Sequence, residues 1–108
     1  METLSVGMYV RTLNGIVKID KIKDSIMIDT KGKTHFGDFI KASYNITDIL
    51  EIGDYVNGYP IYEIVEYEDD TRAIVIDDDN KSIIWKKQDI KSVITHEQME
   101  QMAYKVSE

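Results

Sequence analysis

Alternation of apolar and polar residues is the strongest pattern along this chain. In Gly15–Ile22 and in Tyr59–Tyr67, the alternation places Ile and Val on one face and Lys, Asp or Glu on the other. A period of two is typical of β-strands that have one buried and one exposed face. The dipeptides Asn14–Gly15 and Asn57–Gly58 tolerate the positive φ of tight turns. The pattern therefore predicts short antiparallel strands joined by turns.

The same order of elements occurs twice. Residues 6–10, VGMYV, match residues 52–56, IGDYV, at a separation of 46 positions. A glycine follows each match, and the next apolar stretch aligns Ile16–Ile19 with Ile61–Ile64, which places Lys18 opposite Glu63. A β-rich run that ends in Asp, a polar turn, and a GDFI or KQDIK segment typical of a 3-10 turn complete each copy. Such a repeat predicts one supersecondary unit used twice.

Four or five strands with a late 3-10 turn, in about 45 residues, match the plan of an SH3-like barrel. We predict a mainly β fold with two tandem SH3-like small β-barrel units, residues 1–48 and 49–94, packed together. Residues 95–108 are predicted to form a C-terminal helix and tail. The alternative is that all three parts form one compact domain. A unit of this size is marginal alone, so two copies are expected to share a core. Tyr44–Glu51 is apolar enough to be a strand rather than a linker.

The C-terminal segment predicts a short helix. Thr95 is a suitable N-cap, and Gln98 three residues later completes a capping box. The helix is expected over His96–Ala103, and residues 104–106 are expected to return as an edge strand. One apolar stripe at helical spacing would dock the helix on a barrel; it contains Met99, Met102 and Ala103.

Composition restricts the classes of function. The 108 residues include no cysteine, which excludes disulfides, thiolate zinc sites and cysteine nucleophiles and fits a reducing cytoplasm. No apolar run approaches the roughly 20 residues of a membrane span, and the N-terminus has no basic region of a signal peptide. The net charge of −7 argues against a dedicated duplex-DNA binder. The acidic surplus serves either solubility or contact with a basic partner surface.

Candidates for catalysis are few. His35 and His96 are the only histidines, and neither has a second histidine at ligand spacing. The chain has no nucleophile elbow and no glycine-rich phosphate loop, so we expect neither an enzyme nor a cofactor. The acidic run Asp77, Asp78 and Asp79 is typical of a solvated hairpin turn. Two alternatives are a metal-dependent enzyme that uses this run, and a carboxylate surface that imitates nucleic-acid phosphates.

Candidate binding residues cluster around the single tryptophan. Trp85 and Lys86, with Tyr55 and Tyr59, combine aromatic and basic character, as in the peptide grooves of SH3-like barrels. The alternative is that these aromatic residues pack in the core. Single-stranded nucleic acid is a further candidate ligand if the basic residues of Arg11–Lys33 gather on one face.

Three segments together resemble a known class of proteins. They are VGMYVRTLNGIVKI, IKASYNITDILEIGDYVNGYPIYEI and DIKSVITHEQMEQMAYKV. The chain resembles short accessory proteins encoded by phages and prophages of Gram-positive Firmicutes. Its GDYV segment also resembles the first strand of KOW and other SH3-like modules, which bind RNA or polymerase.

The resemblance implies a cytoplasmic, non-catalytic protein of a bacterial host cell. Many such proteins inhibit host defences by binding, including inhibitors of CRISPR effectors, so the expected partner is a host protein, for instance a nucleic-acid-binding defence effector. The alternative is an SH3/KOW-like nucleic-acid-binding module. No membrane contact is expected, and exposed edge strands leave pairing between two copies of the chain open.

Overall fold

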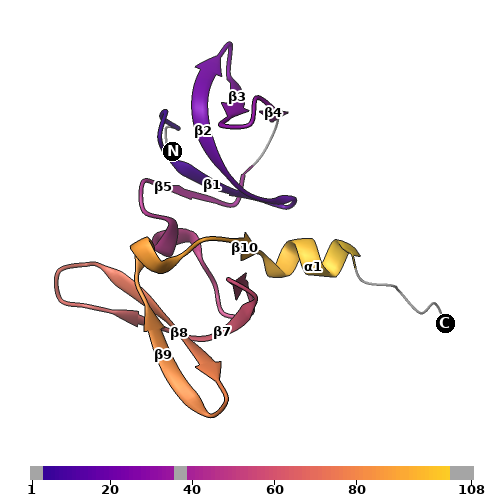
Figure 1. Ribbon diagram of the computed structural model, residues 1–108. Helices are drawn as coiled ribbons and strands as arrows, with labels where there is room; N and C mark the ends of the chain where they lie inside the picture. Colours follow the sequence, from indigo (N-terminus) through magenta and orange to yellow (C-terminus); the bar gives the residue numbers. More distant parts are fainter. Residues whose placement is uncertain (1–3, 36–38, 103–108) are drawn as a thin grey trace.

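The first half of the chain folds into an open five-stranded sheet. The computed structural model describes residues 4–35 and 39–102 (Figure 1). All strand pairs are antiparallel, and the strand order is β4-β3-β2-β1-β5. The strands are β1 (Tyr9–Thr12), β2 (Gly15–Lys23), β3 (Ile26–Asp29), β4 (Thr34–His35) and β5 (Lys41–Ser43).

The second half builds a sheet with the same strand order. The order β10-β6-β7-β8-β9 again places the last strand beside the first strand of a four-stranded meander. The strands are β6 (Tyr55–Val56), β7 (Tyr59–Glu66), β8 (Arg72–Asp78), β9 (Lys81–Trp85) and β10 (Val93–Ile94). The predicted duplication is therefore present as two equivalent five-stranded antiparallel sheets.

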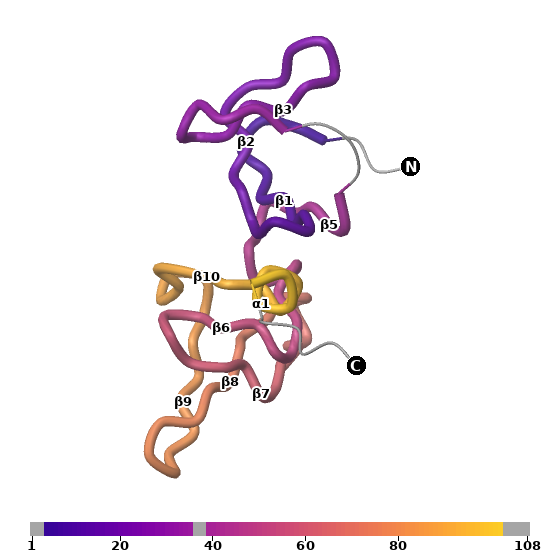
Figure 2. The backbone as a smooth tube through the Cα atoms, turned by 90° about the vertical axis from the view of Figure 1, so that its right-hand side faces the viewer, coloured from indigo at the N-terminus to yellow at the C-terminus, as the bar shows by residue number. Residues whose placement is uncertain are grey.

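Three short helices complete the fold. The 3-10 helix η1 (Ile46–Ile49) connects the two sheets, so the predicted strand over Tyr44–Glu51 is wrong. The predicted 3-10 turn in KQDIK is confirmed as η2 (Lys87–Asp89), whereas the first two residues of GDFI lie outside the described residues. The helix α1 (His96–Met102) leaves the junction between the sheets sideways (Figure 1), and Figure 2 shows it end-on between them. No helix in the described part of the chain is long and apolar enough to cross a membrane.

Matching hydrogen bonds place the two copies in a register that differs from the prediction. The N–H of Gly7 donates to the C=O of Ile19 at 2.9 Å, and the N–H of Gly53 donates to the C=O of Ile61 at 3.2 Å. A β-bulge follows both isoleucines. Lys18 pairs with Tyr9, as Pro60 pairs with Tyr55, so the predicted match of Lys18 with Glu63 is wrong.

The corrected register shows that the β1–β2 hairpin is longer than its counterpart. The pairs Arg11–Ile16 and Thr12–Gly15 extend this hairpin beyond the last pair of the β6–β7 hairpin. The sequence comparison aligned Gly15 with Gly58, but these two glycines are not equivalent. Gly15 pairs with Thr12 in the extended part of the first hairpin, whereas Gly58 lies in the turn of the shorter second hairpin. The extended hairpin reaches the second sheet, where it forms the contacts described below.

Each sheet has its own apolar core, and the predicted shared core is not found. Val10, Ile19 and Met27 are buried beneath the first sheet. The core of the second sheet contains Leu50, Val56, Ile61, Ile74 and Ile76. From the first sheet, Ile16 packs against this second core. Where the halves meet, this apolar contact lies beside a buried pair of charged residues, Arg11 and Asp54.

Neither sheet closes into a barrel within the described residues. No ladder joins β4 to β5, and none joins β9 to β10. With two residues each, β4 and β10 offer too little backbone for a closing ladder. The two predicted small β-barrels are therefore not found as closed barrels in this part of the chain, whereas the predicted mainly β class is confirmed.

The capping box of α1 is confirmed, but its predicted mode of docking is wrong. The N–H of Thr95 donates to Gln98 Oε1 at 2.9 Å, and the N–H of Gln98 donates to Thr95 Oγ1 at 3.2 Å. Met99 and Met102 are 38% and 80% exposed, so the apolar stripe does not dock the helix. Ala103 and the predicted edge strand over residues 104–106 lie outside the described residues.

Polar side chains of α1 instead contact the tip of the extended hairpin. Gln101 Nε2 donates a hydrogen bond to the C=O of Leu13. Gln98 lies against Gly15, where a Cβ atom would come within 2.7 Å of Gln98 Cδ. Gly15 also has a φ of +120°, which disfavours any other residue. The helix that follows the second sheet is thereby attached to the first.

The second core predicts a contrast between two isoleucines of one hairpin. Ile76 is fully buried, whereas Ile84 on the neighbouring strand is 53% exposed. We expect Ile76→Ala to lower the free energy of unfolding by about 2–5 kcal/mol, through lost burial and the cavity that remains. Ile84→Ala is the control and should change it by less than about 1 kcal/mol. Urea unfolding followed by Trp85 fluorescence measures both, and equal effects would contradict the assignment of the core.

Candidate functional site

A buried ion pair lies at the junction of the two sheets. Arg11, from the extended hairpin, and Asp54, from the turn before β6, are both fully buried. Arg11 Nη1 donates to Asp54 Oδ2 at 2.6 Å, and Nη2 donates to Asp54 Oδ1 at 2.7 Å. Arg11 Nη1 also donates to the C=O of Ile49 at 2.9 Å. This two-bond geometry is the strong form of a charge-assisted hydrogen bond.

The surrounding backbone satisfies the remaining hydrogen-bonding capacity of Asp54. The N–H of Glu51 donates to Asp54 Oδ2 at 2.8 Å, and the N–H of His96 donates to Asp54 Oδ1 at 2.9 Å. Asp54 therefore connects the extended hairpin, its own turn and the start of α1. Among the described residues, no buried side-chain nitrogen or oxygen lacks a partner. The junction is thus polar and fully hydrogen-bonded, which offsets the cost of burying charge.

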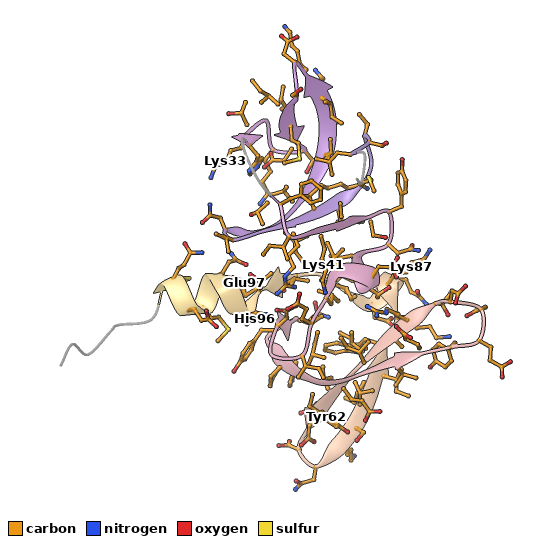
Figure 3. The ribbon with its side chains drawn as sticks, turned by 180° about the vertical axis from the view of Figure 1, so that it is seen from behind. Lys33, Lys41, Tyr62, Lys87, His96 and Glu97 are labelled. Atoms are coloured by element: carbon orange, nitrogen blue, oxygen red, sulfur yellow. The ribbon has the colours of Figure 1, made fainter. Side chains whose placement is uncertain are left out.

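Four more charged side chains surround this pair, of which Figure 3 labels Lys41, His96 and Glu97. Glu97 Oε1 lies 2.7 Å from Arg11 Nη2, and Glu51 Oε2 lies 3.0 Å from Lys41 Nζ. His96 Nε2 lies 2.7 Å from Glu51 Oε1 and 3.2 Å from Glu97 Oε2. We call these six residues the junction network: Arg11, Lys41, Glu51, Asp54, His96 and Glu97. The network contains three carboxylates and, with His96 protonated, three cations.

The network shifts the protonation of two of its members. Burial raises the pKa of Glu51, but hydrogen bonds from His96 and Lys41 and the charge of Arg11 outweigh burial and lower that pKa to about 2. The hydrogen bond to Glu51 raises the pKa of His96 above its ordinary value, against the opposing effect of burial. Both shifts favour the charged forms of the two side chains, which is the direction expected of an ion pair between them.

The junction network also contains one group with metal-ligand character. Glu51, His96 and Glu97 offer three ligand atoms that lie within 4.8 Å of one another. Lys41 and Arg11, however, already hold the second oxygen of each carboxylate. A metal ion would lie near these two cations and near the positive end of α1. The arrangement is therefore better suited to fastening the two sheets together than to holding a cation.

The structure separates the predicted binding residues into two groups. Trp85 is half-buried against the second core, and its ring meets that of Tyr59 edge to face at 5.9 Å between centroids. Lys86 lies over the ring of Tyr67 instead, 5.9 Å from its centroid. Tyr55 is half-buried and pairs with Pro60 and Ile94 in the sheet. These aromatic residues therefore contribute mainly to packing of the second sheet.

The acidic run lies at the opposite end of the same hairpin. Asp77 and Asp79 are exposed and Asp78 is half-buried. Asp79 and Asn80 form the two-residue turn between β8 and β9, with φ of +49° and +67°. Trp85 is the last residue of β9, so the structure does not bring the acidic run and the tryptophan together.

Charge is distributed unequally between the two halves of the chain. Residues 49–94 contain eleven acidic and five basic residues, whereas residues 1–48 contain six acidic and seven basic residues. The exposed carboxylates of the second sheet lie on its strands and in two of its three hairpin turns: Glu63, Glu66, Glu68, Asp69, Asp70, Asp77 and Asp79. We call this set the acidic surface.

Sequence reasoning missed a groove between the two sheets. It has a volume of about 390 Å³, and four lysines but no carboxylate line it. Lys18 and Lys31 belong to a basic stretch that the sequence shows, but Lys87 and Lys91 are far from them along the chain. Only the packing of the two sheets brings the four together. We call this feature the lysine groove.

The comparisons with known proteins assign no relative. The chain matches no protein-family model, no curated protein and no solved structure.

The buried ion pair predicts a large loss of stability on truncation. Arg11→Met leaves the carboxylate of Asp54 buried without its cation, so we expect the free energy of unfolding to fall by about 3–5 kcal/mol. Arg72→Met is the control, because Arg72 pairs with the exposed Glu66 at the surface; its expected effect is about 0–1 kcal/mol. Chemical unfolding at neutral pH measures both. Similar losses in the two variants would show that the buried pair contributes no more to the free energy of unfolding than a surface ion pair does.

The junction network also predicts how stability depends on pH. The raised pKa of His96 gives stability that is complete below its ordinary value of 6.5 and is lost as pH rises through the raised value. The lowered pKa of Glu51 gives stability that is present above its ordinary value of 4.5 and is lost as pH falls toward about 2. We therefore expect the free energy of unfolding to be largest between the two ordinary values, 4.5 for Glu51 and 6.5 for His96. Urea unfolding at constant ionic strength measures this profile.

His96→Gln provides the control for the alkaline side of this profile. The variant should be less stable near pH 5.5, and its loss of stability between about pH 6 and pH 9 should be smaller than that of the natural chain. An unchanged alkaline loss would mean that His96 does not titrate as described.

Proposed function

We propose that this chain is a non-catalytic binding protein that acts by contact with a protein partner through its acidic surface. The observation that carries the proposal is the unequal distribution of charge on two sheets that a buried ion pair holds together. A fixed scaffold with one strongly acidic half complements a basic protein surface and accelerates encounter with it.

Pairing within the junction network supports a non-catalytic role. Within the described ranges, Glu51, His96 and Glu97 are the one group of three closely placed metal-ligand residues. All three already form ion pairs with one another or with Arg11 and Lys41. A general base must be free to accept a proton from a substrate, whereas His96 Nε2 already lies 2.7 Å from Glu51 Oε1 and 3.2 Å from Glu97 Oε2.

The fold and the sequence resemblance suggest a more specific version of this role. Both halves have the strand order of an SH3-like unit, and η2 precedes the last strand of the second half as a 3-10 turn does in that plan. The resemblance to phage and prophage accessory proteins makes an inhibitor of a host defence system the specific proposal. A nucleic-acid-binding effector, such as a CRISPR nuclease, has the basic surface that the acidic surface complements.

Matched pairs of charge substitutions test this proposal. The immobilised chain is incubated with a lysate of a Gram-positive host, and retained proteins are quantified by mass spectrometry. We expect one specific protein to be retained, and the double variant Asp77→Asn and Asp79→Asn to retain several-fold less of it, because rim charges set the rate of association. Asn tolerates the positive φ of residue 79, so this variant should fold normally.

The first sheet supplies the control for this experiment. Asp20→Asn with Asp24→Asn removes the same charge, and Asp24 has a φ of +51° in a turn like that of Asp79. This control should retain the partner as the natural chain does. Retention of no specific protein, or equal retention by both double variants, would contradict the proposal.

A further inference from the structure

The lysine groove runs between the two sheets on the side away from α1. Figure 3 shows Lys87 at the junction, on the side opposite the helix, with Lys41 between them. The first sheet contributes one wall and the segments η1, η2 and β10 contribute the other. The lining residues are Tyr9, Ile16, Val17, Lys18, Thr30, Lys31, Ile46, Lys87, Ile90, Lys91, Ser92 and Val93.

The floor of the groove is apolar and firmly held. Ile16, Ile90 and Val93 line the groove and also pack against the core of the second sheet. The main chain beside them is fixed as well, because the N–H groups of Lys91 and Ser92 donate to Asn57 Oδ1 at 2.8 and 3.0 Å. The groove is therefore formed before any ligand arrives, which lowers the entropic cost of binding.

The walls carry a concentration of positive charge. Lys18, Lys31, Lys87 and Lys91 are all exposed. None of the four forms an ion pair with a carboxylate of the residues that the structure describes. A concave surface lined by one sign of charge raises the local concentration of the opposite ion. The net charge of −7 already keeps the chain soluble, so solubility does not explain why four lysines gather in one groove.

We propose that the lysine groove binds a short segment of single-stranded nucleic acid. Lysine ammonium groups bind phosphates as point charges. Tyr9 lines the same groove, with Lys18 Nζ 5.3 Å from the centre of its ring. An aromatic side chain beside a basic groove is the arrangement on which unpaired bases stack. This inference goes beyond the proposed function, since it concerns another surface and another class of partner.

The boundary of the groove favours one strand over two. At Lys87 the groove meets a second pocket, of about 200 Å³, which Asp48 and Asp69 help to line. Arg72, Lys86 and Lys87 line this pocket too, so charge of both signs lies directly beyond the groove. A duplex carries one phosphate charge per about 1.7 Å of its axis, twice the density of one strand, so the two carboxylates repel a duplex more strongly than they repel one strand. An acidic peptide would also pair with the lysines. Its carboxylate side chains, however, have no flat ring to stack on Tyr9 or to cover the apolar floor, whereas a nucleic-acid base has one.

Fluorescence anisotropy with a labelled oligonucleotide of about 12 deoxythymidines tests the inference. We expect binding at low salt that weakens as salt rises, with a slope of log K against log salt near −3 if four phosphates are contacted. The duplex of the same length, and a poly-glutamate peptide, should each compete at least about tenfold more weakly.

Charge reversal inside and outside the groove supplies the matched variants. Lys18→Glu with Lys91→Glu should weaken binding at least about tenfold and reduce the salt slope. Lys33→Glu with Lys81→Glu makes the same change of net charge at exposed positions that do not line the groove, and should change binding far less. Unfolding curves of both double variants confirm that they fold.

Three results would overturn the inference. They are absence of binding at low salt, equal loss in the two double variants, and competition by the duplex or the peptide as strong as that by the single strand. None of them bears on the protein partner, because that experiment depends on Asp77 and Asp79. The two proposals can therefore fail separately.

Discussion

The ion pair between Arg11 and Asp54 determines how the two halves of this chain sit together. Each side chain alone would be a buried charge without a partner, which is costly. Together, with the C=O of Ile49 and two backbone N–H groups, they form a closed set of hydrogen bonds. Because the pairing requires a particular position and angle, it fixes one arrangement of two sheets that each have an apolar core of their own and also touch through Ile16.

Duplication supplies two similar sheets, and a few differences between the copies make them a single object. At the position of Asp54, the first copy has Met8, which packs against its own core. The first hairpin is longer than the second, and its extra residues include Arg11 and Ile16. Arg11 forms the ion pair with Asp54, and Ile16 packs against the core of the second sheet. The longer hairpin and the change from Met8 to Asp54 therefore act together at the junction.

The junction also explains why the surface has two characters. On one side, α1 covers the ion pair, and Glu97, Glu51, Lys41 and His96 neutralise one another. On the other side no carboxylate lines the groove, and four lysines remain facing solvent. The excess of negative charge lies on the second sheet, and one of its carboxylates, Asp69, lines the pocket that adjoins the groove at Lys87. A chain with one large net charge can therefore present surfaces of both signs, each to a different kind of partner.

Local patterns determined much of this protein: alternation gave the strands, Asn57–Gly58 and Asp79–Asn80 gave tight turns, and Thr95 with Gln98 gave the start of α1. These features depend on residues within a few positions of one another. The docking of α1, the length of the first hairpin and the partners of Arg11 and His96 depend on contacts between distant segments. Tertiary structure alone decided them, because the free energy of a buried charge depends on what surrounds it, and those neighbours come from the other half of the chain.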